Sequence, residues 1–116
     1  MVIIYNNIDR ASGAPELSVS VSLQLLWDTT SGPVAKVDES DTMIQGSYST
    51  SSDENGYWET EVVDNDSITP IDSVYRIIET TKASNISTYY ISVPDAATPV
   101  PLWVGDLIVA TPDWIV

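Results

Sequence analysis

The chain has 116 residues and 43% hydrophobic content, which fits one globular domain and excludes wholesale disorder. Its net charge of −13 would repel nucleic-acid phosphates and anionic lipid surfaces, so we expect neither nucleic acid nor a membrane as a partner. The sequence contains no His and no Cys, which excludes imidazole and thiolate chemistry, disulfides and the usual zinc sites.

Short strands are predicted along most of the chain, beginning with an apolar one at residues 2–5. The clearest alternation lies at 17–27, where apolar side chains share one face and Ser or Gln side chains the other. That apolar face holds Leu17, Val19, Val21, Leu23, Leu25 and Trp27. A polar loop with a short strand at 34–37 follows, and further strands are predicted at residues 43–50, 57–63, 74–80, 86–93 and 102–109.

The segment 52–62 combines a turn signal with a strand that begins on two aromatic residues. Asn55 and Gly56 both tolerate positive φ, so we expect a tight turn there and a β-hairpin around it. Trp58 is expected in the core, with the alternate side chains of that strand, Tyr57, Glu59 and Glu61, facing away from it. A second hairpin is predicted between 74–80 and 86–93, with Pro94 ending its second strand.

The fold class follows from the number and spacing of these strands. No helical apolar stripe extends over ten residues or more. Roughly seven short strands separated by turn signals predict an all-β protein, built as a single antiparallel β-sandwich. We expect the sandwich to span residues 1–109, with an apolar C-terminal tail at 110–116.

Carboxylates and amides are the main candidates for chemistry. Glu59 and Glu61 lie two apart on one predicted strand, but a solvated pair is favoured over a catalytic one in so acidic a chain. The loops 53–55 and 64–66 offer oxygen ligands for calcium, without the spacing of an EF-hand. The alternative is that these side chains cap turns through hydrogen bonds. We therefore expect no enzyme activity and no cofactor.

The four tryptophans carry the largest apolar side chains. Trp27, Trp58 and Trp103 lie in predicted strands and are expected in the core. Trp114 lies in the tail, which either folds back on its own domain or docks on a neighbour. The candidate interface residues are Trp114, Ile115, Val116, Leu102 and Trp103.

Several stretches between residues 50 and 109 resemble a known family. The run 53–58 is similar to a hairpin of carboxypeptidase-regulatory-like and transthyretin-like sandwiches. The runs 68–70, 74–79, 89–94 and 103–107 resemble the β-sandwich module of tailed-bacteriophage virion proteins, which often begins minor tail proteins and tail fibres. The resemblance implies an immunoglobulin-like or transthyretin-like sandwich with a structural role and no catalytic residues.

Because no shaft or receptor-binding domain follows the module in this chain, the resemblance favours a small accessory protein. We expect a capsid decoration protein on the virion surface, assembled in the cytoplasm of a host bacterium. Its partner would be the major capsid protein or another virion protein, and it would be a homo-oligomer such as a trimer. One alternative is a minor tail or fibre-adaptor protein. Another is a carbohydrate-binding module, since Trp and Tyr rings stack on pyranoses.

Overall fold

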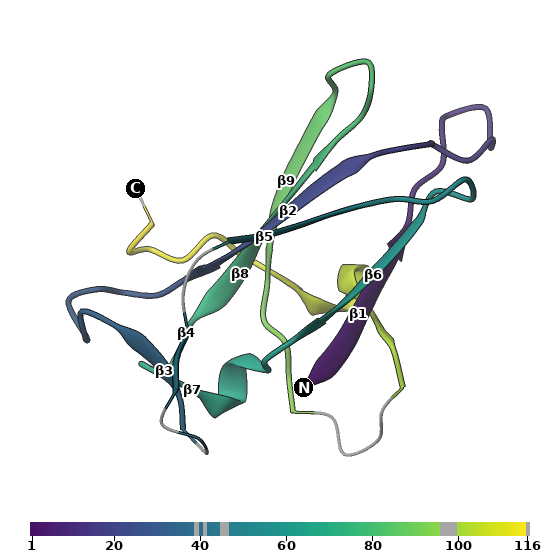
Figure 1. Ribbon diagram of the computed structural model, residues 1–116. Helices are drawn as coiled ribbons and strands as arrows, with labels where there is room; N and C mark the ends of the chain where they lie inside the picture. Colours follow the sequence, from purple (N-terminus) through teal and green to yellow (C-terminus); the bar gives the residue numbers. More distant parts are fainter. Residues whose placement is uncertain (39, 41, 45–46, 96–99, 116) are drawn as a thin grey trace.

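The computed structural model describes residues 1–38, 40, 42–44, 47–95 and 100–115 (Figure 1). Regular structure in these residues is β-strand apart from two 3-10 helices, η1 (Asn65–Ser67) and η2 (Val104–Leu107). The all-β class is therefore confirmed, and none of the described segments is a helix that could cross a membrane. The strands of five to seven residues are β1 (Val2–Asn7), β2 (Ser20–Leu26), β5 (Ser47–Ser51), β6 (Tyr57–Val62), β8 (Val74–Thr80) and β9 (Ile86–Ile91). The shorter strands are β3 (Ala35–Val37), β4 (Thr42–Ile44), β7 (Ile68–Thr69), β10 (Leu102–Trp103) and β11 (Ile108–Val109).

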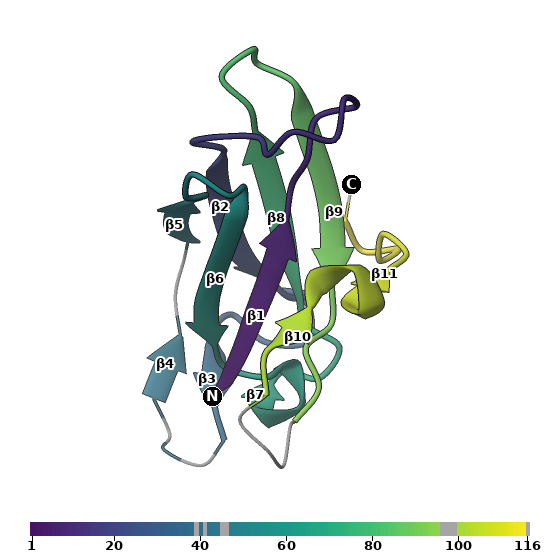
Figure 2. The ribbon, with the colours of Figure 1, turned by 90° about the vertical axis from the view of Figure 1, so that its right-hand side faces the viewer.

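Two sheets form the body of the molecule. One has the strand order β10-β1-β6 and the other β11-β9-β8-β2-β5, and Figure 2 shows the first lying in front of the second. A third sheet, β4-β3-β7, lies at the lower end in both views. Described strand pairs are antiparallel except β1 with β10, which run parallel with Ile4 opposite Leu102 and Tyr5 opposite Trp103.

The core lies between the two body sheets because alternate side chains of each strand point to the same face. Ile4 and Trp58 of the three-stranded sheet are 0% and 1% exposed. From the five-stranded sheet, the same cluster includes Val21, Leu23, Leu25, Tyr75, Ile77 and Ile91. Complete burial stabilises each large apolar side chain by about 1.5–3 kcal/mol, so this shared core is what joins the sheets.

The expected strand number is too low, since the described residues contain eleven strands in three sheets. The predicted strand 102–109 is interrupted by η2, so that β10 joins one body sheet and β11 the other. The predicted strand 43–50 likewise separates into β4 and β5, with residues 45 and 46 outside the described ones. Strand β2 begins only at Ser20, because Ser18 has a φ of +54° that an extended strand does not allow.

The predicted hairpin at 52–62 is wrong, although its turn is present. β5 pairs with β2 and β6 pairs with β1, so the turn connects two different sheets. Only Gly56 has positive φ there, at +73°, and its N–H donates to the Asp53 carbonyl at 3.1 Å. The Asp53 carboxylate accepts from the N–H groups of Asn55 and Tyr57, which closes the turn without a left-handed Asn. The second hairpin, β8 with β9, is confirmed.

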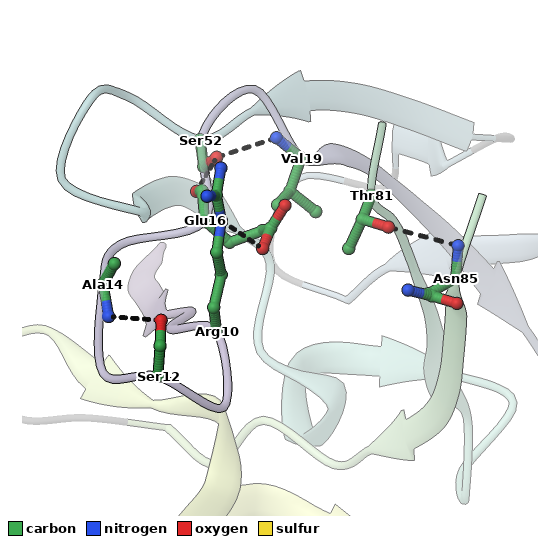
Figure 3. A network of polar contacts seen from close by, with 8 residues as sticks. All are labelled: Arg10, Ser12, Ala14, Glu16, Val19, Ser52, Thr81 and Asn85. Carbon is green, nitrogen blue, oxygen red and sulfur yellow. Dashed lines mark hydrogen bonds and ion pairs between the residues drawn. The ribbon is translucent and has the colours of Figure 1, made fainter. Parts of the chain in front are cut away.

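Two loops interlock at one end of the body (Figure 3). The N–H of Ile8 donates to the Gly56 carbonyl at 2.8 Å, and the Glu16 N–H donates to the Ile8 carbonyl at 2.9 Å. The buried Ser52 hydroxyl accepts from the Val19 N–H at 2.8 Å and donates to the Glu16 carbonyl at 3.3 Å. These bonds fix the connection from β1 to β2 against the connection from β5 to β6.

The turn between β8 and β9 offers a stabilising substitution. Ser84 has a φ of +65°, a conformation that costs an L-residue roughly 1–2 kcal/mol and a glycine much less. The backbones of Thr81, Ser84 and Asn85 carry two hydrogen bonds of the turn. A third runs from the Asn85 N–H to the Thr81 hydroxyl (Figure 3), and none of them uses the Ser84 side chain, so all survive the change. After allowance for the entropy of an unfolded glycine, Ser84→Gly is expected to add about 0.5–1 kcal/mol of stability. The midpoint of urea unfolding should rise, whereas the control Ser87→Gly, within strand β9, should lower it; a lower midpoint for both contradicts the assignment.

Candidate binding surface

The predicted interface residues lie in the C-terminal segment but against two different sheets. Leu102 and Trp103 form β10, at one edge of the three-stranded sheet. Trp114 and Ile115 follow β11, the edge strand of the five-stranded sheet. Val116 lies outside the described residues. Leu102 packs against the core, so the exposed apolar surface of β10 belongs to Trp103.

Trp103 packs one face of its indole on the chain. A Cβ built on Gly105 would lie 2.4, 2.5 and 2.7 Å from three atoms of the six-membered ring of the indole, so that face packs on the glycine. The indole N–H donates to Asn6 Oδ1 at 3.0 Å, and the residue is still 47% exposed. The expected core position of Trp103 is therefore wrong, whereas that of Trp58 is confirmed. Trp27 is half-buried against the core and donates its N–H to the Gly32 carbonyl.

Two tyrosines and a carboxylate continue this surface across the sheet. Tyr5 is opposite Trp103 on one side and opposite Glu59 on the other. Tyr5 and Glu59 point to the same face of the sheet, and Trp103 lies at the edge of that face, where its indole extends to Asn6. The rings of Tyr5 and Tyr57 are 5.8 Å apart with an interplanar angle of 29°, and the Tyr57 hydroxyl donates to Glu59 at 3.0 Å. Slight burial and this hydrogen bond raise the pKa of Tyr57. We call Trp103, Tyr5, Tyr57 and Glu59 the aromatic face.

A buried carboxylate supports the aromatic face from the core side. Glu79 is 7% exposed and accepts from the Trp58 indole N–H at 2.7 Å and from the Asn6 amide at 2.9 Å. The Tyr89 hydroxyl is buried beside this carboxylate without hydrogen-bond geometry to a described group, and burial together with the Glu79 charge raises the pKa of Tyr89. Asn6 thus joins Glu79 inside the protein to Trp103 at its surface, which fixes the angle of the exposed indole.

The tail folds against its own domain as far as the structure describes it. Trp114 lines an open cavity of about 260 Å³ together with the start of β8, Ser92 just after β9, the end of β11 and the residues that follow it. Trp114 and Ile115 are both half-buried there. Part of their apolar surface is therefore left for contact with a neighbour.

The loop carboxylates hold turns. Asp53 closes the turn before β6, and Asp64 accepts from the Ser67 hydroxyl at 2.7 Å. Asn65, also buried, donates to the Ser73 hydroxyl and accepts from the Val93 N–H. The capping interpretation is therefore confirmed for Asp53, whereas Asp64 makes no side-chain bond to a backbone N–H at the start of η1 and Asn65 joins distant segments. The described residues contain no group of three or more His, Cys, Asp or Glu side chains arranged to hold a metal. Glu59 and Glu61 are exposed on one face of β6, as expected.

Sequence reasoning did not find the contributions of Tyr5, Asn6 and Glu79. The alternation of β1 was visible, and it places Tyr5 on the face opposite Ile4. The parallel pairing that brings residue 103 to residue 5 has no local signal, because it joins the two ends of the chain. No protein-family model matches the chain, and no curated protein matches it.

Proposed function

We propose that the chain is a non-enzymatic accessory protein of a tailed-phage virion, a capsid decoration protein bound to the major capsid protein on the outer shell. The protein would have an immunoglobulin-like or transthyretin-like sandwich fold and would bind the shell as a homo-oligomer such as a trimer. The virion would be assembled in the bacterial cytoplasm. Support comes from the virion-module resemblance of residues 68–107 together with the all-β fold. A rigid β-body with a separate apolar segment suits a protein whose task is attachment.

The observation that carries the proposal is the presence of exposed apolar side chains in the C-terminal segment, at the edges of both body sheets. Val100 and Ile108 are 60% and 55% exposed, and Trp114 and Ile115 are half-buried. Single exposed apolar residues are common on soluble proteins, and these are proposed as contacts because they follow one another along a segment that borders both body sheets. The net charge of −13 keeps such a protein soluble and favours a basic partner surface.

Deletion of residues 112–116 is expected to weaken attachment to capsids and to leave the domain folded. The removed residues follow the last strand and contribute only half-buried side chains to the described structure. Binding of the truncated protein should be measured by co-sedimentation with capsids that lack the full-length accessory protein. Circular dichroism checks that the truncated protein is folded. Ile86→Ala, on the exposed start of β9, is the matched control and should bind normally. Saturation of capsids by the truncated protein at unchanged affinity would show that the tail is not the anchor.

The second candidate is a minor tail or fibre-adaptor protein. It is favoured by the place that the resembling module commonly has, at the start of tail proteins and fibres. Electron microscopy of intact particles distinguishes the two candidates. Density at regular positions on the shell supports the decoration protein. Density at the tail alone contradicts it and supports the tail or fibre-adaptor protein.

A further inference from the structure

We propose that the aromatic face is a binding site for neutral oligosaccharides, with the open side of Trp103 stacking on a pyranose ring. This inference goes beyond the proposed function, because it holds for either position on a virion. It depends on three features of the described residues: the orientation of the Trp103 indole, the polar groups beside it and the charge of strands β1, β6 and β10.

The indole of Trp103 is presented as a flat platform. Gly105 packs against one face, and the residue as a whole is 47% exposed. The N–H is already bonded to Asn6, so a ligand need not satisfy it. A sugar presents C–H groups on one side of its ring and hydroxyls around the rim, and an open aromatic plane complements the C–H side.

The groups around the platform suit the hydroxyl rim. Tyr5 and Glu59 follow Trp103 in one row across the sheet, and the Tyr57 hydroxyl is bonded to a single Glu59 oxygen. The exposed carboxylate therefore retains accepting capacity for sugar hydroxyls. The Asn7 amide, exposed at the end of β1, lies next in the sequence after the Asn6 that holds the indole.

The charge of the sheet selects the ligand class. Strands β1, β6 and β10 contain no Lys and no Arg, whereas β6 carries Glu59 and Glu61 on its exposed face. Sialylated, uronate-containing or sulfated glycans would meet like charge without a compensating cation. Neutral hexose and N-acetylhexosamine chains meet no such penalty.

The site is held in place before a ligand arrives. Asn6 uses its amide nitrogen on Glu79 and its amide oxygen on Trp103, and Glu79 is itself held by the buried Trp58. Little side-chain freedom is then lost on binding, which favours affinity for a ligand that offers a small contact area.

The test is an NMR titration of the intact protein with cellohexaose, maltohexaose and chitohexaose, with polygalacturonate as the acidic comparator. Indole N–H signals report on each Trp separately, and Trp103→Phe assigns the signal of interest. We expect a neutral oligosaccharide to move the Trp103 signal and to leave those of the buried Trp58 and the half-buried Trp27 in place. No shift with any neutral chain, a response to the acidic one alone, or a shift confined to Trp114 overturns the proposal.

Variants test whether binding requires the position of the Trp103 indole as well as its presence. Trp103→Ala should weaken binding about tenfold or more, the scale of one lost aromatic stacking contact. Gly105→Ala keeps the indole but displaces it, and should weaken binding similarly. Ile86→Ala, an exposed apolar residue on β9 of the other body sheet, is the control and should bind normally.

If Trp103→Ala fails to fold, the titration of the unaltered protein still decides the question. A Trp103 signal that moves with protein concentration, together with dimers in light scattering, would assign this face to a second copy of the chain instead of a sugar. That outcome overturns the proposal as well.

Discussion

Trp58→Ala is expected to destabilise the protein by about 4–6 kcal/mol, the largest loss for a single side chain here. Truncation of a fully buried Trp costs roughly 3–5 kcal/mol through lost burial and the cavity left behind. Trp58 is 1% exposed and also donates to the Glu79 carboxylate at 2.7 Å, so the substitution removes a donor from a buried charge as well. Urea unfolding followed by circular dichroism measures the loss. A domain of this size has about 5–15 kcal/mol of stability in all, so the variant should be partly or wholly unfolded at 37 °C.

Trp103→Ala is the matched control, since it removes the same atoms from a half-exposed position. Its cost should be less than half that of Trp58→Ala, because less apolar surface is lost. Equal costs would contradict the assignment of Trp58, and not Trp103, to the core.

The contribution of the Glu79 hydrogen bond can be separated from that of burial. Trp58→Phe keeps most of the apolar ring and removes the N–H, for an expected loss of about 1.5–3 kcal/mol. The double variant Trp58→Phe with Glu79→Leu should lose less stability than the sum of the two single losses. Trp58→Phe alone leaves a buried carboxylate that lacks one hydrogen-bond donor, and Glu79→Leu removes that carboxylate. Additive losses would mean that the two side chains do not interact.

Local patterns in the sequence predicted the strands better than the sheets. The alternation from Val21 to Leu25 is the core face of β2, and Val74–Thr80 pairs with the following strand as expected. Both features depend only on neighbours in the chain. The separation of β5 and β6 into different sheets, and the meeting of Tyr5 with Trp103, depend on packing between distant segments. Period-two alternation is the same for a strand that turns back and for one that crosses to a facing sheet.

The candidate surface was missed for a related reason. A large aromatic residue in a predicted strand is usually buried, and Trp58 follows that rule. Trp103 does not, because β10 has only two residues before η2 begins and Gly105 offers the indole a flat surface outside the core. Glu79 would also have been assigned to solvent as a charged residue. Its burial requires donors from β1 and β6 that only the assembled sheets bring together.

Gly56→Ala is expected to cost about 2–5 kcal/mol, far more than a helix- or strand-propensity change. The φ of +73° costs an L-residue roughly 1–2 kcal/mol. In addition, a Cβ at this position would lie 2.2 Å from the Ile8 carbonyl oxygen and 3.3 Å from the Glu16 backbone. Overpacking of this kind typically adds about 1–3 kcal/mol. The obstacle is backbone, and that backbone is itself fixed by the hydrogen bonds from Ile8 to Gly56 and from Glu16 to Ile8, so it cannot move aside without loss of both loops.

Gly13→Ala separates the two causes. Gly13 has a φ of +89°, but a Cβ there meets no atom within 4 Å, so only the conformational cost of about 1–2 kcal/mol applies. The difference between the two variants in urea unfolding therefore measures the contact of the turn at 53–56 with the loop that follows β1. A difference near zero would mean that this turn tolerates a side chain and that the interlocked loops are not packed as described. A large difference would mean that Gly56 is required where the chain passes from the five-stranded sheet to the three-stranded sheet. This passage between sheets is what distinguishes the turn from that of a hairpin, whose two strands pair with each other.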